Sequence, residues 1–156
     1  ISQNRKHNEI SIKDWYLTID NNITNTFLVC KHAIELMKKK KYGKIINISS
    51  VAGRNRSKLA GVHYSMAKSA VITLTRQIGA EVASYGINVN CLAPSQTNTE
   101  MLKPFLTPKN KEMLSNMIPI GRVAEPEEQA KVVLFLASED ASYMVGSIVD
   151  VNGGQI

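Results

Sequence analysis

The sequence predicts an α/β fold, and two kinds of segment indicate it. Lys44–Ile48 and Ile87–Ala93 are short apolar runs rich in Ile and Val, as buried strands are. Trp15–Lys38 and Tyr64–Ser84 instead carry apolar residues at helical spacing. Because strand and helix patterns alternate, the segment Lys44–Lys68 is predicted to form the strand–loop–helix half of an α/β unit.

The composition limits the chain to one domain and excludes several classes of protein. A chain of 156 residues forms one domain at most, or part of one, and an apolar fraction of 44% is enough for a packed core. No apolar run approaches the roughly 20 residues of a membrane span, and no signal peptide is visible, so we expect a cytoplasmic protein without membrane contacts. Cys30 and Cys91 lie outside any CxxC or Cys/His cluster, which predicts two buried, reduced thiols and no metal site.

The net charge of +6 raises the question of a nucleic-acid partner. Much of this charge is local, in Lys38–Lys41 and in Arg54, Arg56 and Lys58. The lysine run closes a predicted helix, where cations complement the helix dipole. No aromatic residues are interleaved with these cations, so the pattern favours a solvated surface and predicts no nucleic-acid partner.

The first helix is predicted to begin near Ser11, which is followed three residues later by Asp14 in a pattern similar to a capping box. Asn21 and Asn22 lie inside this helix, although Asn disfavours helix interiors because its amide competes for backbone hydrogen bonds. From the residues alone they are two exposed polar side chains. Gly43 is predicted to end the helix in the left-handed conformation.

The second helix opens with Tyr64 and carries Lys68 one turn later, so both side chains are predicted to share one helix face. A free phenol, with a pKa of about 10, exchanges protons poorly at neutral pH. A nearby ammonium group and a helix N-terminus both lower that pKa. A serine at the end of the preceding strand, Ser49 or Ser50, can donate a hydrogen bond to a substrate oxygen. This pattern predicts proton exchange with a carbonyl or an alcohol, rather than an exposed Tyr and Lys on an amphipathic helix.

Proline residues punctuate the remaining third of the chain. Pro94 is predicted to end the strand Ile87–Ala93, and Thr107 with Pro108 forms an N-cap and N1 pair. Pro126 begins a further helix. Four apolar residues of that helix are predicted to face inward: Ala130, Val133, Leu134 and Leu136.

These motifs together resemble the classical short-chain dehydrogenase/reductase family, and the resemblance extends over essentially the whole chain. The segments that carry it are DNNITNTF, SSVAG, YSMAK, APSQTNT and FLASEDASYMVGSIVDVNGG. The resemblance implies the C-terminal part of a Rossmann-type doubly wound parallel sheet, in which Ser147–Val151 is the last strand. Residues 1–156 would then form a single partial domain.

The resemblance also implies a role for each site residue. Tyr64 would be the general acid/base, and Lys68 would lower its pKa and bind the nicotinamide ribose. Ser50, the second serine of SSVAG, would position the substrate oxygen. Asn22 would distort its helix locally and hold a water molecule that relays protons to the lysine.

The implied cofactor is NAD or NADP, and part of its site is recognisable. Pro94, Thr97 and Thr99 hold the places that contact the nicotinamide carboxamide in the family, whereas Ser95 replaces a glycine and could alter the local backbone. No TGxxxGxG or GxGxxG turn occurs, although a Rossmann half normally begins with one. We therefore interpret the sequence as the C-terminal portion of a longer dehydrogenase, which keeps the catalytic residues and the substrate-covering lid at residues 100–120.

The predicted function is an NAD(P)-dependent oxidoreductase that interconverts a carbonyl and an alcohol. The chain is similar to 3-oxoacyl-acyl-carrier-protein reductases, in which two basic residues commonly dock the carrier. Lys41 fits one of these positions but Tyr85 occupies the other, so an acyl-carrier substrate and a small alcohol, polyol or sugar both remain open. The alternative is a non-catalytic fragment that associates through its helices but binds no dinucleotide. A homodimer or homotetramer is expected, because the family pairs the two long helices across a two-fold axis.

Overall fold

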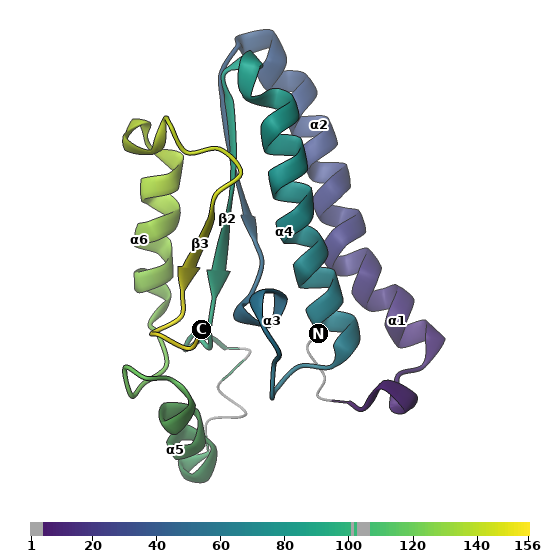
Figure 1. The fold of residues 1–156 in the computed structure, drawn as a ribbon, viewed down its shortest axis with the longest axis vertical. Coiled ribbons are helices and arrows are strands. Elements are labelled where there is room, and N and C mark those ends of the chain that lie inside the picture. The colour runs from purple at the N-terminus through teal and green to yellow at the C-terminus, as the bar shows by residue number, and fades with distance from the viewer. Residues whose placement is uncertain (1–4, 101, 103–106) are drawn as a thin grey trace.

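The computed structural model describes residues 5–100, 102 and 107–156, and its centre is a three-stranded parallel sheet (Figure 1). The strands are β1 (Gly43–Ile48), β2 (Ile87–Pro94) and β3 (Ile148–Val151), in the order β1-β2-β3. In register, Gly43 lies beside Ile87, and Cys91 lies beside Ile148. The predicted α/β fold and the parallel strands are confirmed, and β2 is the central strand of the three.

Helices cover both faces of this sheet. On one side lie α1 (Ile12–Ile19) and α2 (Asn25–Lys40), joined by a π-helical turn over Asp20–Thr24, together with α4 (Val62–Val82) (Figure 1). On the other side lies α6 (Pro126–Ala137), while α3 (Val51–Arg54) and α5 (Pro108–Met117) lie near the carboxyl ends of the strands (Figure 1). None of the helices in the described ranges is both long and apolar enough to cross a membrane.

The main core lies between the sheet and the helices α2 and α4. Alternate residues of β2 point toward these helices, because successive side chains of a strand point to opposite faces. The buried residues of this cluster are Cys30, Ile34, Ile78, Val82, Ile87 and Val89, and a second cluster contains Val71, Ile72 and Cys91. Both cysteines are free and buried, as predicted.

Two predicted helix caps, Ser11 and Thr107, are confirmed and one is wrong. The Ser11 hydroxyl accepts a hydrogen bond from the Asp14 amide at 3.1 Å, as the N-cap of α1. The predicted cap at Gly43 is wrong, because α2 ends at Lys40 and Lys41 takes the left-handed conformation with φ 50°. Gly43 instead begins β1, where a Cβ atom would lie only 2.4 Å from the Met37 sulfur. Glycine is therefore needed there for close packing of the strand against α2.

The inward face of α6 is narrower than its sequence suggests. Leu136 is buried with 1% of its surface exposed, and Val133 is half-buried. Leu134 and Ala130 are exposed, which contradicts the prediction that they face inward, and the exposed fraction of Leu134 is 72%. The helix therefore presents an apolar surface to solvent as well as to the sheet.

Candidate active site

A cavity of about 680 Å³ opens at the carboxyl ends of β1 and β2, and most of the predicted site residues line it. Open α/β sheets place their ligands at this end. The predicted catalytic residues Ser50, Tyr64 and Lys68 line the cavity. The predicted cofactor contacts Pro94, Thr97 and Thr99 line it too. Asn22, the fourth predicted catalytic residue, is not among the lining residues.

The two serines after β1 have different partners. The Ser49 hydroxyl donates a hydrogen bond of 2.8 Å to the carbonyl of Lys68, so it joins the strand end to α4. The Ser50 oxygen accepts a hydrogen bond of 3.1 Å from the Ala52 amide and is the N-cap of α3. Because its oxygen accepts this bond, the Ser50 hydroxyl proton remains available for a group in the cavity.

Tyr64 is the third residue of α4, one turn before Lys68. Burial raises the pKa of the Tyr64 phenol, and a hydrogen bond with Ser50 lowers it again in part. Lys68 makes no contribution to this shift in the pKa, so the expected lowering by Lys68 stays a prediction. Burial of Tyr64 thus favours its neutral phenol, which can donate a proton.

The Lys68 ammonium group is directed at the strand end. Its Nζ donates a hydrogen bond of 3.0 Å to the Ile48 carbonyl and lies 5.7 Å from the centre of the Tyr64 ring. Burial lowers the pKa of Lys68. The backbone of β1 therefore fixes the lysine beside the phenol, and the side chain can donate further hydrogen bonds into the cavity.

Asn22 lies in the π-helical turn between α1 and α2, and this turn contacts α4. The Asn22 amide donates a hydrogen bond of 2.9 Å to the Thr18 carbonyl, and Asn21 donates one of 2.9 Å to Leu17. The helix is locally distorted at this place, as the π-helical turn shows, and both asparagine side chains bond to backbone carbonyls beside it. The proton relay through Asn22 stays a prediction.

The segment after β2 adopts an ordinary backbone despite the serine in place of glycine. The Ser95 amide donates a hydrogen bond of 3.3 Å to the Val151 carbonyl, so the segment is held by β3. Among the described residues other than glycine, only Lys41 has a positive φ. Ser95 therefore needs none of the torsions that favour glycine.

Gln96 also lines the cavity, although nothing in the segment APSQTNT marks it as a site residue. Its Oε1 atom is buried and has no hydrogen-bond partner within the part of the chain that the structure describes. Unpaired buried acceptors are costly, so this oxygen suits a ligand that brings an N–H group. A primary carboxamide such as that of nicotinamide has such a group.

Apolar side chains form another wall of the cavity, and no local pattern in the sequence marks them as cavity residues. They come from the loop before α4, from Leu102 and from α5. The residues are Leu59, Leu102, Met113 and Leu114. Leu102, Met113 and Leu114 belong to the predicted lid at residues 100–120, whereas residues 101 and 103–106 of that prediction lie outside the described residues.

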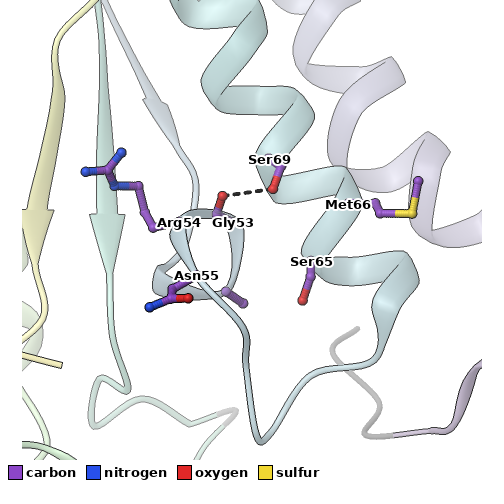
Figure 2. A pocket seen from close by; sticks show the side chains of 7 residues that line it. Gly53, Arg54, Asn55, Ser65, Met66 and Ser69 are labelled. Atoms are coloured by element: carbon purple, nitrogen blue, oxygen red, sulfur yellow. Dashed lines mark hydrogen bonds between the residues drawn. The ribbon is translucent and has the colours of Figure 1, made fainter. Parts of the chain in front are cut away.

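A second, smaller pocket of about 410 Å³ lies where α3 meets α4 (Figure 2). Gly53 and Ser69 face each other across it, and the Ser69 hydroxyl donates a hydrogen bond of 2.8 Å to the Gly53 carbonyl (Figure 2). Arg54 also borders this pocket, but its guanidinium group points away from α4 and toward β2 and β3 (Figure 2). The pocket thus marks a close contact between two elements that carry site residues.

Comparison with known proteins gives a family and several close relatives. A family model described as "Enoyl-(Acyl carrier protein) reductase" matches residues 1–155. The 3-oxoacyl-[acyl-carrier-protein] reductase FabG of Aquifex aeolicus is 38% identical over 154 residues, which are 99% of this chain and 61% of that protein. The chain thus spans about 61% of the length of this curated relative.

Solved structures with bound dinucleotides are similar over the same extent. A 3-oxoacyl-[acyl-carrier protein] reductase with bound NAD from Brucella melitensis has a TM-score of 0.90 and 33% identity, covering 100% of this chain and 59% of that one. A gluconate 5-dehydrogenase from Burkholderia cenocepacia in complex with NADP and tartrate has a TM-score of 0.93 and 29% identity, covering 99% and 61%.

Proposed function

The chain belongs to the short-chain dehydrogenase/reductase family, and from this premise we propose that the whole protein is an NAD(P)-dependent oxidoreductase that interconverts a carbonyl and an alcohol. The observation that supports this most directly is the common cavity lined by Ser50, Tyr64 and Lys68. The alternative is a non-catalytic polypeptide that binds no dinucleotide. It does not explain why a phenol, an ammonium group and a hydroxyl line the same cavity.

The proposed chemistry divides among three side chains. In reduction, the neutral Tyr64 phenol donates its proton to the carbonyl oxygen as negative charge develops there. Ser50 donates a hydrogen bond to the same oxygen. Lys68 holds the ribose hydroxyls and stabilises the phenolate that remains. The nicotinamide, when bound, supplies the hydride on reduction and accepts it on oxidation.

The described residues fit the nicotinamide end of NAD or NADP. The unpaired Oε1 of Gln96 is a buried acceptor for a carboxamide N–H group. Pro94, Thr97 and Thr99 border the same part of the cavity and are the proposed contacts around it. Asn22 is proposed to support the proton relay through the π-helical turn, which contacts α4.

The substrate proposed first is a thioester-linked 3-oxoacyl group, with a small alcohol or sugar as the second candidate. The apolar wall formed by Leu59, Met113 and Leu114 suits an acyl chain. Tyr85 occupies one of the two positions expected to dock an acidic carrier, but the Lys38 ammonium lies 5.0 Å from the centre of its ring. A cation therefore does lie at each position, Lys38 at one and the exposed Lys41 at the other.

This basic surface lies at the amino end of β1, whereas the cavity lies at the carboxyl end. The 21 residues of α4 separate the two ends, which corresponds to about 30 Å at 1.5 Å per residue. We therefore propose that a carrier docked there delivers its substrate to the cavity of a second copy that lies antiparallel beside the first. The substrate proposal thus depends on the oligomer.

A homodimer or homotetramer is proposed, because α1, α2 and α4 expose several large apolar side chains to solvent. Its large exposed residues are Tyr16, Leu17, Phe27, Leu28, Val29, Leu36, Val62 and Met66. Large exposed apolar patches on soluble proteins usually mark interaction sites. A two-fold axis would bury this face against the same face of another copy.

The oligomer prediction is tested with one charge on each of two apolar surfaces. Val29, which is 68% exposed on α2, changes to Glu, and Leu134, which is 72% exposed on α6, changes to Glu as the matched control. A buried unpaired carboxylate is costly, so Val29→Glu is expected to halve the mass measured by light scattering. A mass unchanged by Val29→Glu at micromolar concentration would exclude dimerisation through α2.

The proposed function is tested by comparing the whole protein with the 156-residue chain. The whole protein should consume NADH or NADPH in the presence of a 3-oxoacyl thioester. The chain by itself has no Gly-rich turn whose amides would bind the pyrophosphate, so it should bind both cofactors weakly and show no turnover. Fluorescence titration measures binding. Micromolar affinity of the short chain would contradict this account of the dinucleotide site, and absence of turnover with thioesters, ketones and keto sugars would contradict the proposed function.

A further inference from the structure

We infer that the ion pair between Arg54 and Asp150 is a positioning device that holds the Ser50 hydroxyl in place, an inference that rests on the proposed function. The two residues are 96 positions apart in the chain. Arg54 is the last residue of α3, and Asp150 lies in β3. Ser50 is the N-cap of the same short helix, so the pair and the serine occupy its two ends.

The pair has the forked geometry of a specific contact. Arg54 Nε donates to the two Asp150 oxygens at 3.0 and 3.2 Å, and Arg54 Nη2 donates to Oδ2 at 2.8 Å. A planar guanidinium group bound in this way fixes direction as well as distance. The side chain crosses β2 to reach β3 (Figure 2). It therefore ties the end of α3 to a strand that is not its neighbour.

The helix α3 depends on such contacts for its orientation, because it has only four residues. On its other side it is fixed to α4 by the hydrogen bond from Ser69 to the Gly53 carbonyl and by direct contact of Gly53 with the Lys68 backbone. The ion pair is the opposing anchor. With both anchors in place, the helix cannot turn about its contact with α4, and its N-cap Ser50 keeps a constant position relative to Tyr64.

The Arg54–Asp150 pair is partly exposed to solvent. Its side chains are 31% and 28% exposed, so screening by water limits its contribution to the free energy of unfolding, whereas its forked geometry still fixes the direction of the contact. Neither residue lines the large cavity, so neither touches substrate there. An effect of this pair on turnover would have to act through α3.

The first test compares turnover of variants of the whole protein. Arg54→Met and Asp150→Asn should each lower kcat about tenfold, since small displacements of a catalytic group are costly, and should leave the KM for the dinucleotide unchanged. Adding Arg54→Met to Ser50→Ala should lower kcat no further. The exchanged pair, Arg54→Asp with Asp150→Arg, should restore part of the loss. The control is Glu139→Gln, which removes a 3.7 Å ion pair with Lys44 at the opposite end of β1.

A second measurement needs no turnover, so it separates failure of this inference from failure of the proposed function. Because Ser50 lowers the pKa of Tyr64, releasing Ser50 should raise it. For each variant, the ultraviolet absorbance of tyrosine phenolates is measured as a function of pH. The same titration is then made with Tyr64→Phe added to that variant. The difference between the two curves gives the titration of Tyr64 alone. Arg54→Met and Ser50→Ala should shift this titration upward alike, with Glu139→Gln unchanged. The inference would be overturned if Arg54→Met left the pKa of Tyr64 unchanged. It would also be overturned if the losses of kcat in Arg54→Met and Ser50→Ala added up in the double variant.

Discussion

Replacing Tyr64 with phenylalanine in the whole protein is expected to lower turnover by about 10²-fold or more, while dinucleotide affinity stays within a few fold. Loss of a general acid/base typically costs this much. The hydroxyl is the only group removed, so the packing of the ring in the cavity is retained. Steady-state assays in both directions, with fluorescence titration of the cofactor, measure the two quantities.

The matched control is Tyr143→Phe, which makes the same chemical change at a fully exposed ring, 102% accessible. It should leave turnover unchanged. The pH profile adds a second criterion, because burial raises the pKa of Tyr64 and alcohol oxidation requires the phenolate. Oxidation by the unmodified protein should therefore rise with pH through the neutral and alkaline range, and this rise should vanish in Tyr64→Phe. Near-normal turnover of Tyr64→Phe would exclude its proposed role.

Gly53→Ala is expected to destabilise the protein and lower its turnover together. A Cβ atom at Gly53 would lie 2.6 Å from the carbonyl carbon of Lys68 and 2.8 Å from its oxygen, which are backbone atoms that cannot rotate away. Overpacking of this kind costs about 1–3 kcal/mol. The displaced α3 would carry Ser50 with it. Thermal unfolding and turnover measure the two effects.

The control for this prediction is Ser65→Ala, on the same pocket between α3 and α4 (Figure 2). That change removes an atom instead of adding one, so it should alter neither quantity appreciably. If Gly53→Ala had the melting temperature and turnover of the unmodified protein, the close contact between α3 and α4 would have no importance for the site.

The strands and long helices could be predicted from the sequence because their signals are local. Apolar periodicity located β1, β2, α2 and α4. A Ser or Thr residue directly before a predicted helix located the N-caps of α1 and α5, which are Ser11 and Thr107. Gly43 was misassigned because glycine serves both left-handed caps and close contacts, and only the packing of Met37 decides between them. Leu134 and Ala130 were misplaced because the rotation of α6 about its axis is set by the sheet, not by its own pattern.

The candidate site was predictable only where its residues are close together in the sequence. Tyr64 and Lys68 are one helical turn apart, so spacing alone brings them together. The direction of the Tyr64 pKa shift was not predictable, because it depends on burial by segments far along the chain. Leu59, Gln96 and Met113 carry no chemical motif and are recognised only by where the chain places them.

The contact between Arg54 and Asp150 also has a consequence for the order in which the molecule folds. Chain segments far apart in sequence meet late, because closing a long loop costs entropy before the contact returns any free energy. The β1–α4–β2 unit closes over a shorter stretch of chain than the 96 residues that separate this pair. We therefore expect the phenol and the ammonium group to come together early in folding, and the serine to acquire its final orientation only when β3 docks. Hydrogen exchange at the α3 amides should accordingly be faster than at the amides of α4, whose opening requires loss of the core.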